Sequence, residues 1–236
     1  MENNIYFSSI SKSFDGKIVL DNLSHGFKLN QVHVILGKSG MGKSVLLKML
    51  MGLMKPDSGK ILINNINLDD VRIKENFKTS YVFQFSALLN SLSVIDNVTL
   101  YLDENNIDTK ENRLKKAYKL LNDLGVEQSA DKIPSDLSGG MRKRVAIARS
   151  LMIEPEILLY DEPTAELDQI NTKIIADIVI ELKKNSPITQ LVVTHDISFA
   201  LAIADTISIL DEGVINLSDS PEIIKKTNHP LLHPIA

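Results

Sequence analysis

The stretch Gly37-Lys38-Ser39-Gly40-Met41-Gly42-Lys43-Ser44 follows the pattern G-x-x-x-x-G-K-[ST]. An apolar run at Val32–Leu36 precedes it and another at Val45–Leu50 follows it, which indicates a strand, a glycine-rich loop and a helix. Backbone N–H groups of such a loop converge on phosphate oxygens, and the positive end of the helix dipole points to the same place. We therefore predict a nucleotide phosphate site where Lys43 reaches the β- and γ-phosphates and Ser44 offers its hydroxyl to Mg²⁺. The alternative is a flexible Gly/Ser turn before a core helix.

The composition is that of a globular chain, and it excludes several classes of function. Hydrophobic residues make up 44% of the 236 residues, enough for one large α/β domain or two small ones. The net charge of -4 gives no basic field, so we expect no nucleic-acid partner. Because the chain has no cysteine, disulfides and thiolate metal sites are excluded, which fits a reducing cytoplasm. The most apolar long window, Ile188–Leu210, carries His195, Asp196 and Asp205 and is not expected to cross a membrane.

Turn residues divide the N-terminal region into short strands that suit a small antiparallel sheet. Strands are expected at Ile5–Phe14, Lys17–Leu20 and Gly26–Leu29, with breaks at Asp15-Gly16 and Asn22–His25, and further strands at Lys60–Ile63 and Tyr81–Phe83. From Ile157 onward strands and helices alternate, with strands at Ile157–Tyr160, Thr189–Val193 and Thr206–Leu210 and helices at Asn171–Lys184 and Ile197–Ala204. Unbroken apolar strands between amphipathic helices predict a parallel sheet covered on both faces.

The region from about residue 86 to residue 151 contains helical patterns and little strand pattern. Asp108 and Glu111 resemble a capping box, and Gly125 ends the amphipathic helix that follows them. We therefore expect a helical insertion within the nucleotide-binding domain.

Two carboxylates, Asp161 and Glu162, follow the apolar strand at Ile157–Tyr160. In a sheet that carries a phosphate-binding loop, this strand end presents an acid to the nucleotide. We expect Asp161 to hold Mg²⁺ directly or through water, and Glu162 to polarise the attacking water. A strand followed by an ordinary polar turn would look the same in isolation, so the interpretation depends on the glycine-rich loop upstream.

A second potential phosphate site is Leu137-Ser138-Gly139-Gly140-Met141, which precedes a helix predicted over Arg142–Met152. Ser138 suits the N-cap, and the glycines leave the helix end open to an anion. Two such helix ends on one ATP within one subunit would be redundant, so Ser138 is expected to serve a nucleotide held by another copy of the chain. Taken alone, Ser-Gly-Gly before a helix is more often only a cap.

Together these motifs resemble the nucleotide-binding subunits of ABC ATPases, in the family's order and over nearly the whole chain. The resemblance implies ATP and Mg²⁺ as cofactors. It assigns nucleotide contacts to Phe14 of the A-loop, Gly37, Lys38, Ser39, Gly40, Met41, Gly42, Lys43, Ser44, Val45, to Ser138, Gly139 and Gly140 of the signature, and to Asp168 of the D-loop. It assigns the metal to Ser44, Gln84 and Asp161, and hydrolysis to Glu162, Gln84 of the Q-loop and the switch histidine His195. In isolation Phe14 would suit a core aromatic, Gln84 a strand end and His195 a capped turn.

The same resemblance implies the fold class: α/β, a P-loop NTPase (RecA-like) core with an N-terminal antiparallel β subdomain and an inserted α-helical subdomain. A single ABC ATPase domain would fill residues 1–236, with 1–85 and 152–236 as the core and 86–151 as the helical signature subdomain. Two positions depart from the family pattern. Met141 stands where the signature commonly ends in Gln, and Glu166 stands where the D-loop usually has a small residue. Neither departure removes a group essential to hydrolysis.

Within the family, several stretches resemble the branch that drives Mla/Mce-type phospholipid transport: Gly40–Leu47, Tyr81–Leu89, Val94–Val98 and Ser138–Met141. This predicts an ATPase that acts as a homodimer with integral-membrane permease subunits and a lipid-binding substrate protein, on the cytoplasmic face of a bacterial inner membrane. The alternatives are the ATPase of another ABC transporter, for lipoprotein release or for amino-acid or metal import, and a soluble ABC mechanoenzyme. A third class, a small-molecule kinase with the same loop, would need an acceptor site and a lid and does not explain Ser138 or His195. A mechanoenzyme usually needs a coiled-coil insertion or two nucleotide domains, for which 236 residues leave no room. The apolar tail His229–Ile235 is compatible with docking on a neighbouring subunit and with disorder alike.

Overall fold

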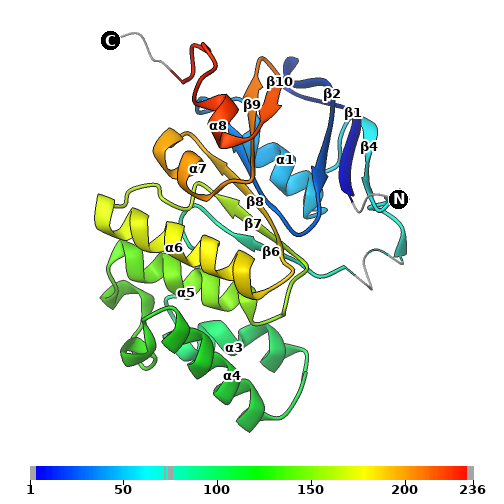
Figure 1. The fold of residues 1–236 in the computed structure, drawn as a ribbon. Helices are drawn as coiled ribbons and strands as arrows, with labels where there is room; N and C mark the ends of the chain where they lie inside the picture. The colour runs from blue at the N-terminus through cyan, green and yellow to red at the C-terminus, as the bar shows by residue number, and fades with distance from the viewer. Residues whose placement is uncertain (1–3, 72, 74–76, 233–236) are drawn as a thin grey trace.

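The computed structural model describes residues 4–71, 73 and 77–232. The described part of the chain forms two sheets (Figure 1). The four-stranded sheet is antiparallel, with the order β2-β1-β4-β5, and consists of β1 Asn4–Phe14, β2 Lys17–Lys28, β4 Ser58–Ile63 and β5 Ile66–Asn67. The six-stranded sheet has the order β10-β9-β3-β8-β7-β6 and consists of β3 Val32–Leu36, β6 Thr79–Val82, β7 Ile157–Asp161, β8 Thr189–Thr194, β9 Thr206–Asp211 and β10 Val214–Asp219. Strands β6, β7, β8, β3 and β9 run parallel, and β10 pairs with β9 antiparallel.

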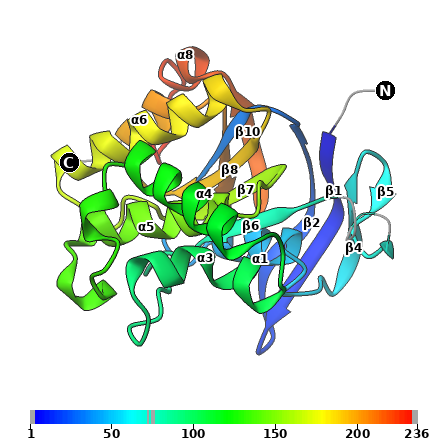
Figure 2. The same cartoon turned by 90° about the horizontal axis from the view of Figure 1, so that it is seen from below.

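Helices cover both faces of the six-stranded sheet, as the sequence predicts. The described helices are α1 Lys43–Leu50, α3 Val94–Glu104, α4 Lys110–Asp123, α5 Gly139–Leu151, α6 Gln169–Asn185, α7 Ile197–Ile203 and α8 Pro221–Ile224, with short 3₁₀ turns at Glu127–Ser129 and Pro134–Asp136. Leu158 and Tyr160 of β7 belong to the core shared with α5, α6 and α7, whereas Leu159 belongs to the core shared with α1 and the antiparallel sheet. This alternation follows from the two-residue period of a strand. Figure 2 shows α3, α4 and α5 grouped together, away from β1, β2 and β4.

One predicted strand break is wrong. The sequence suggested a turn at Asn22–His25, but β2 continues through these residues, and the pairing of β1 with β2 shifts register between Ile10 and Lys12. Asn22 has a φ of 46°, and its backbone N–H donates to Ser11 Oγ at 3.0 Å. The polar residues that suggested a turn therefore form a bulge, which also needs a residue that tolerates positive φ.

The helix start predicted at Asp108 is wrong by one residue. Thr109 caps α4, because its backbone is extended and its hydroxyl accepts from the Asn112 N–H at 3.3 Å. Asp108 has a φ of 66°, which an N-cap does not adopt, and Glu111 is therefore not the third residue of the helix from its cap. Gly125, with a φ of 65°, ends the helical segment as predicted.

The C-terminal segment continues from α8 to Leu232, which packs against the core shared with α5, α6 and α7. Of the predicted tail at 229–235, residues from 233 onward lie outside the described residues, and docking of this tail on a neighbour stays a prediction. None of the described helices is both long enough and apolar enough to cross a membrane.

Candidate nucleotide-binding and hydrolytic site

The glycine-rich loop joins β3 to α1, in the order that the sequence predicts. Gly40 and Gly42 have φ values of 82° and 92°, which favour glycine. A Cβ at Gly42 would lie 2.8 Å from Val19 Cγ1, so close packing against β2 also requires glycine there. Helix α1 begins at Lys43, directly after this glycine, so the free N–H groups of its first turn lie beside the loop.

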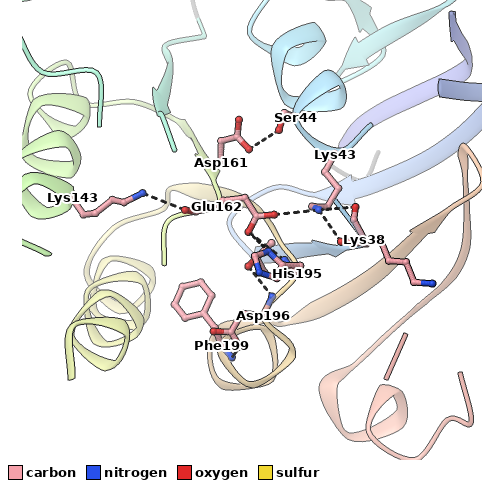
Figure 3. A network of polar contacts seen from close by, with 11 residues as sticks. Lys38, Lys43, Ser44, Lys143, Asp161, Glu162, His195, Asp196 and Phe199 are labelled. Carbon is pink, nitrogen blue, oxygen red and sulfur yellow. Dashed lines mark hydrogen bonds and ion pairs between the residues drawn. The ribbon is translucent and has the colours of Figure 1, made fainter. Parts of the chain in front are cut away.

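Lys43 is buried against the loop and pairs with a carboxylate. Its Nζ donates to the carbonyl oxygens of Gly37 at 2.7 Å and Lys38 at 3.1 Å, and lies 3.2 Å from Glu162 Oε1. Figure 3 shows the Lys43 side chain pointing to Glu162. The Lys43 and Glu162 side chains are only 6% and 11% exposed, so solvent screens this ion pair little. An anionic phosphate that approaches Lys43 would compete with Glu162 for the same ammonium group.

Ser44 and Asp161 place hard oxygen ligands side by side. Ser44 Oγ donates to Asp161 Oδ1 at 2.7 Å, and the Tyr81 hydroxyl donates to Asp161 Oδ2 at 2.7 Å. A hydroxyl next to a carboxylate suits Mg²⁺, which prefers oxygen ligands, so the residues present fit this ion. Burial, reinforced by the hydrogen bond to Asp161, raises the pKa of Tyr81, which therefore stays a neutral donor.

Glu162 is oriented by groups on both of its oxygens. Oε1 faces Lys43, and Oε2 lies 2.9 Å from His195 Nδ1 and accepts from the His195 backbone N–H at 3.3 Å. Because Glu162 follows β7 and His195 follows the neighbouring parallel strand β8, the two residues meet at the carboxyl edge of the sheet. Glu162 has a φ of 47°, a sparsely populated conformation for this residue type that is typical of functional sites.

Most of the residues predicted for the nucleotide site line a cavity of about 560 Å³. It is lined by Phe14, Val19, Lys38, Ser39, Gly40, Gly42, Lys43, Ser44, Val45, Gln84, Glu162 and His195. Gly37 and Met41 belong to the loop without lining the cavity, and Val19 lines it without having been predicted. Its volume lies within the ordinary range for small-molecule sites. Phe14, which is 40% exposed, reaches the cavity from the antiparallel sheet.

The predicted signature and D-loop residues form a separate group. Among the residues that the structure describes, Ser138, Gly139, Gly140 and Asp168 are not part of the cavity wall. Ser138 caps α5, as the sequence predicts. The helix begins at Gly139, three residues before the predicted start at Arg142. A Cβ at Gly140 would lie 2.0 Å from Asn171 Oδ1, so this glycine allows α5 to pack against the start of α6. Asn171 in turn donates to Asp168 Oδ1 from its backbone N–H at 2.7 Å, and this hydrogen bond lowers the pKa of Asp168.

The two departures from the family pattern have different surroundings. Met141 is partly buried and packs against the core shared with α5, α6 and α7. Glu166 is exposed and has a φ of 65°, a left-handed conformation that is unfavourable for a residue with a Cβ. Burial lowers the pKa of Lys143, and the negative charge of Glu166 offsets part of that lowering.

Sequence reasoning missed Lys143, which links two of the site's loops. It is buried in α5, and its Nζ donates to the backbone carbonyl of Gln84. The same Nζ donates to the backbone carbonyl of Glu162 at 3.3 Å (Figure 3). The helical spacing contained a signal, because Lys143 lies three residues after Gly140 and four before Ile147, on the buried stripe of the helix.

Comparison with known proteins shows the family of this chain. Residues 20–165 match a family model described as ABC transporter. The chain belongs to this family. An ABC relative, the lipoprotein-releasing system ATP-binding protein LolD of Buchnera aphidicola subsp. Schizaphis graminum, is 39% identical, over 84% of this chain and 91% of that protein. The glutamate/aspartate import ATP-binding protein GltL of Escherichia coli (strain K12) is 37% identical, over 92% of this chain and 91% of that protein.

Solved ABC structures agree with the fold. The ATP-binding cassette MJ0796, described in a dimeric post-hydrolysis state bound to ADP and Pi, superposes with a TM-score of 0.82 and 31% identity, covering 92% of this chain and 98% of that chain. The ABC ATPase fold and the ATPase activity predicted from the sequence are thereby confirmed, with ATP and Mg²⁺ as its nucleotide and metal ion. Family membership also supports cassette dimers and membrane permeases as partners in general. The two relatives described above are named for lipoprotein release and for glutamate/aspartate import, and not for the predicted phospholipid branch.

Proposed function

We propose that this chain is the ATP-hydrolysing subunit of an ABC transporter for phospholipid, of the Mla/Mce type. It would act as a homodimer with a separate permease and a lipid-binding substrate protein, on the cytoplasmic face of a bacterial inner membrane. The placement of Glu162 supports the role in ATP hydrolysis. Its Oε1 lies 3.2 Å from Lys43 Nζ, and its Oε2 lies 2.9 Å from His195 Nδ1. The phospholipid part is supported by the stretches Tyr81–Leu89 and Ser138–Met141, which resemble that branch.

Residues of the cavity wall, together with Asp161 beside Ser44, have different roles in this proposal. Phe14 stacks on adenine, while the glycine-rich loop and Lys43 hold the phosphates. The bound metal ion, held by Ser44, Asp161 and Gln84, would offset phosphate charge. Glu162 accepts a proton from the attacking water, and His195 holds Glu162 Oε2 and contacts the γ-phosphate.

The signature residues would complete the site of a second copy, because Ser138 is not part of the cavity wall in its own chain. Ser138→Ala removes the N-cap of α5, and Ser93→Ala removes the matched N-cap of α3. Each should cost about 1 kcal/mol of stability. We expect only Ser138→Ala to lower the turnover number, with unchanged ATP binding to the isolated chain. Equal turnover in both variants would argue against the shared site.

The substrate is tested by reconstitution. The tagged chain is purified from membranes with its permease, and the complex is placed in liposomes with fluorescent phospholipid or with a lipoprotein substrate. Transfer of phospholipid that requires ATP and stops with Glu162→Gln would support the proposal. Lipoprotein release alone would favour a second candidate function, the ATPase of a lipoprotein-releasing transporter, which the 39% identity to LolD supports. Stimulation by an amino-acid or sugar receptor would overturn both assignments.

A further inference from the structure

Tyr81 is a buried residue of β6 that none of the sequence motifs assigns to the site. Its side chain is 5% exposed, and its hydroxyl donates to Asp161 Oδ2 at 2.7 Å. We propose that Tyr81 is a positioning residue that fixes the Asp161 carboxylate for metal binding. This inference rests on the proposed role of Asp161 in holding Mg²⁺.

The sheet register explains how Tyr81 reaches Asp161. In the parallel pair of β6 with β7, Tyr81 is aligned with Leu159. Asp161 lies two residues beyond Leu159, so its side chain is on the same face of the sheet as those of Leu159 and Tyr81. The diagonal neighbour on an adjacent strand is within reach of a long aromatic side chain. A shorter side chain at this position would leave Asp161 Oδ2 without this donor.

The hydrogen bond divides the two carboxylate oxygens of Asp161 between different tasks. Oδ2 is held by Tyr81, while Oδ1 accepts from Ser44 Oγ at 2.7 Å and lies on the side of the glycine-rich loop (Figure 3). A hydroxyl-to-carboxylate bond of this length is charge-assisted and directional. It therefore restricts χ2 of Asp161, a terminal torsion whose distribution is otherwise broad. The oxygen beside Ser44 is then available to a metal ion in one orientation.

A purely structural explanation is that a buried tyrosine needs some acceptor for its hydroxyl. Tyr160 on β7 shows that case, because it is fully buried and donates to Gln190 Oε1 at 2.9 Å, on the opposite face of the sheet. Tyr160→Phe therefore provides a matched control for Tyr81→Phe. Each variant loses one buried hydroxyl and one side-chain hydrogen bond, but only Tyr81→Phe frees Asp161.

The experiment measures metal binding directly, with Mn²⁺ as the probe. Free Mn²⁺ is quantified by electron paramagnetic resonance in titrations of the full chain with a non-hydrolysable ATP analogue, and analogue binding is measured separately in EDTA. Loss of an outer partner of a metal ligand typically weakens metal affinity about 10- to 100-fold. We expect that loss for Tyr81→Phe and for Tyr81→Met, with metal-free nucleotide binding unchanged, and wild-type Mn²⁺ affinity for Tyr160→Phe.

Two outcomes would overturn the assignment of Tyr81. One is wild-type Mn²⁺ affinity in Tyr81→Phe while Asp161→Asn loses affinity, which would leave Tyr81 as a packing residue. The other is an equal loss in the Tyr81 and Tyr160 variants, which would indicate a general effect on the sheet. If Asp161→Asn itself binds Mn²⁺ normally, the metal role of Asp161 fails, and the proposed site fails with it.

Discussion

Removal of the negative charge at Glu162 should tighten ATP binding while it slows hydrolysis. Lys43 Nζ lies 3.2 Å from Glu162 Oε1, and both side chains are almost fully buried. A phosphate group that binds Lys43 must therefore displace or share this partner. Glu162→Gln keeps the size of the side chain, and Lys43 keeps the carbonyls of Gly37 and Lys38 as acceptors. The variant lacks the carboxylate charge that competes with phosphate at Lys43 and that also faces His195.

The magnitude follows from the strength of the interaction that is removed. A hydrogen bond to a charged partner contributes about 1.5–3 kcal/mol. If phosphate no longer has to compete with it, ATP affinity should rise roughly 10- to 150-fold. Loss of the general base should slow hydrolysis by ~10²–10⁴ in the same variant. Binding and turnover should thus change in opposite directions.

The assay is a titration with fluorescent ATP in EDTA, at a low protein concentration. Glu166→Gln is the control, because Glu166 is an exposed acid on the same loop and its change in charge is identical. A double-mutant cycle with Lys43→Ala isolates the pair, since Glu162→Gln should give no gain when Lys43 is absent. An equal gain in Glu166→Gln, or a gain that persists without Lys43, would refute the reasoning.

Three further predictions concern other parts of the chain. Gly59 has a φ of 85°, and a Cβ there would lie 2.3 Å from Ser9 O, so Gly59→Ala should lower the unfolding free energy by about 2–5 kcal/mol in urea denaturation. Gly16→Ala, with a φ of 79° and open space around it, should cost clearly less. Burial lowers the pKa of His25 from 6.5 to about 4, so the unfolded chain binds the extra proton and stability should fall as pH drops from 6.5 to 4. His25→Gln should flatten that dependence of the urea midpoint, and parallel pH profiles would contradict it. Phe14→Ala should weaken ATP binding by about 1–3 kcal/mol, the usual contribution of base stacking, while the affinity for inorganic tripolyphosphate stays the same.

The residues at strand ends could be predicted from the sequence. Asp161 ends β7, and Glu162 and His195 directly follow β7 and β8. Lys43 and Ser44 follow β3 after the glycine-rich loop, and the carboxyl ends of these parallel strands meet at one edge of the sheet. Their convergence in the structure is therefore a consequence of sheet topology. Lys43, Ser44, Asp161 and Glu162 could be predicted from the motifs and the strands before them, whereas His195 was predicted only from the resemblance to the family.

Residues whose contacts depend on register or on the orientation of a helix could not be found in this way. The bond from Tyr81 to Asp161 requires knowledge of which residues of β6 and β7 are aligned. Lys143 reaches the carbonyls of Gln84 and Glu162 because α5 is packed with that side inward. Both facts come from tertiary packing, which local sequence does not specify.

Local signals also failed where two structures need the same residue type. Asn tolerates positive φ, which both a turn and a β-bulge require. In the structure β2 pairs with β1 through this segment, so Asn22 lies in a bulge. Asp108 and Thr109 are both good N-caps by residue type. Because an N-cap has an extended backbone and Asp108 has a positive φ, Thr109 is the N-cap of α4.

The continuous strand β2 has a consequence for how small a working piece of this chain can be. Val19 and Leu20 lie against the position of a Cβ on Gly42, and the Asp21 N–H donates to Gly213 O at 3.1 Å in the turn between β9 and β10. A fragment that starts after β2 would keep every residue of the glycine-rich loop but lose the surface that supports it. The smallest unit expected to bind nucleotide therefore includes the antiparallel sheet.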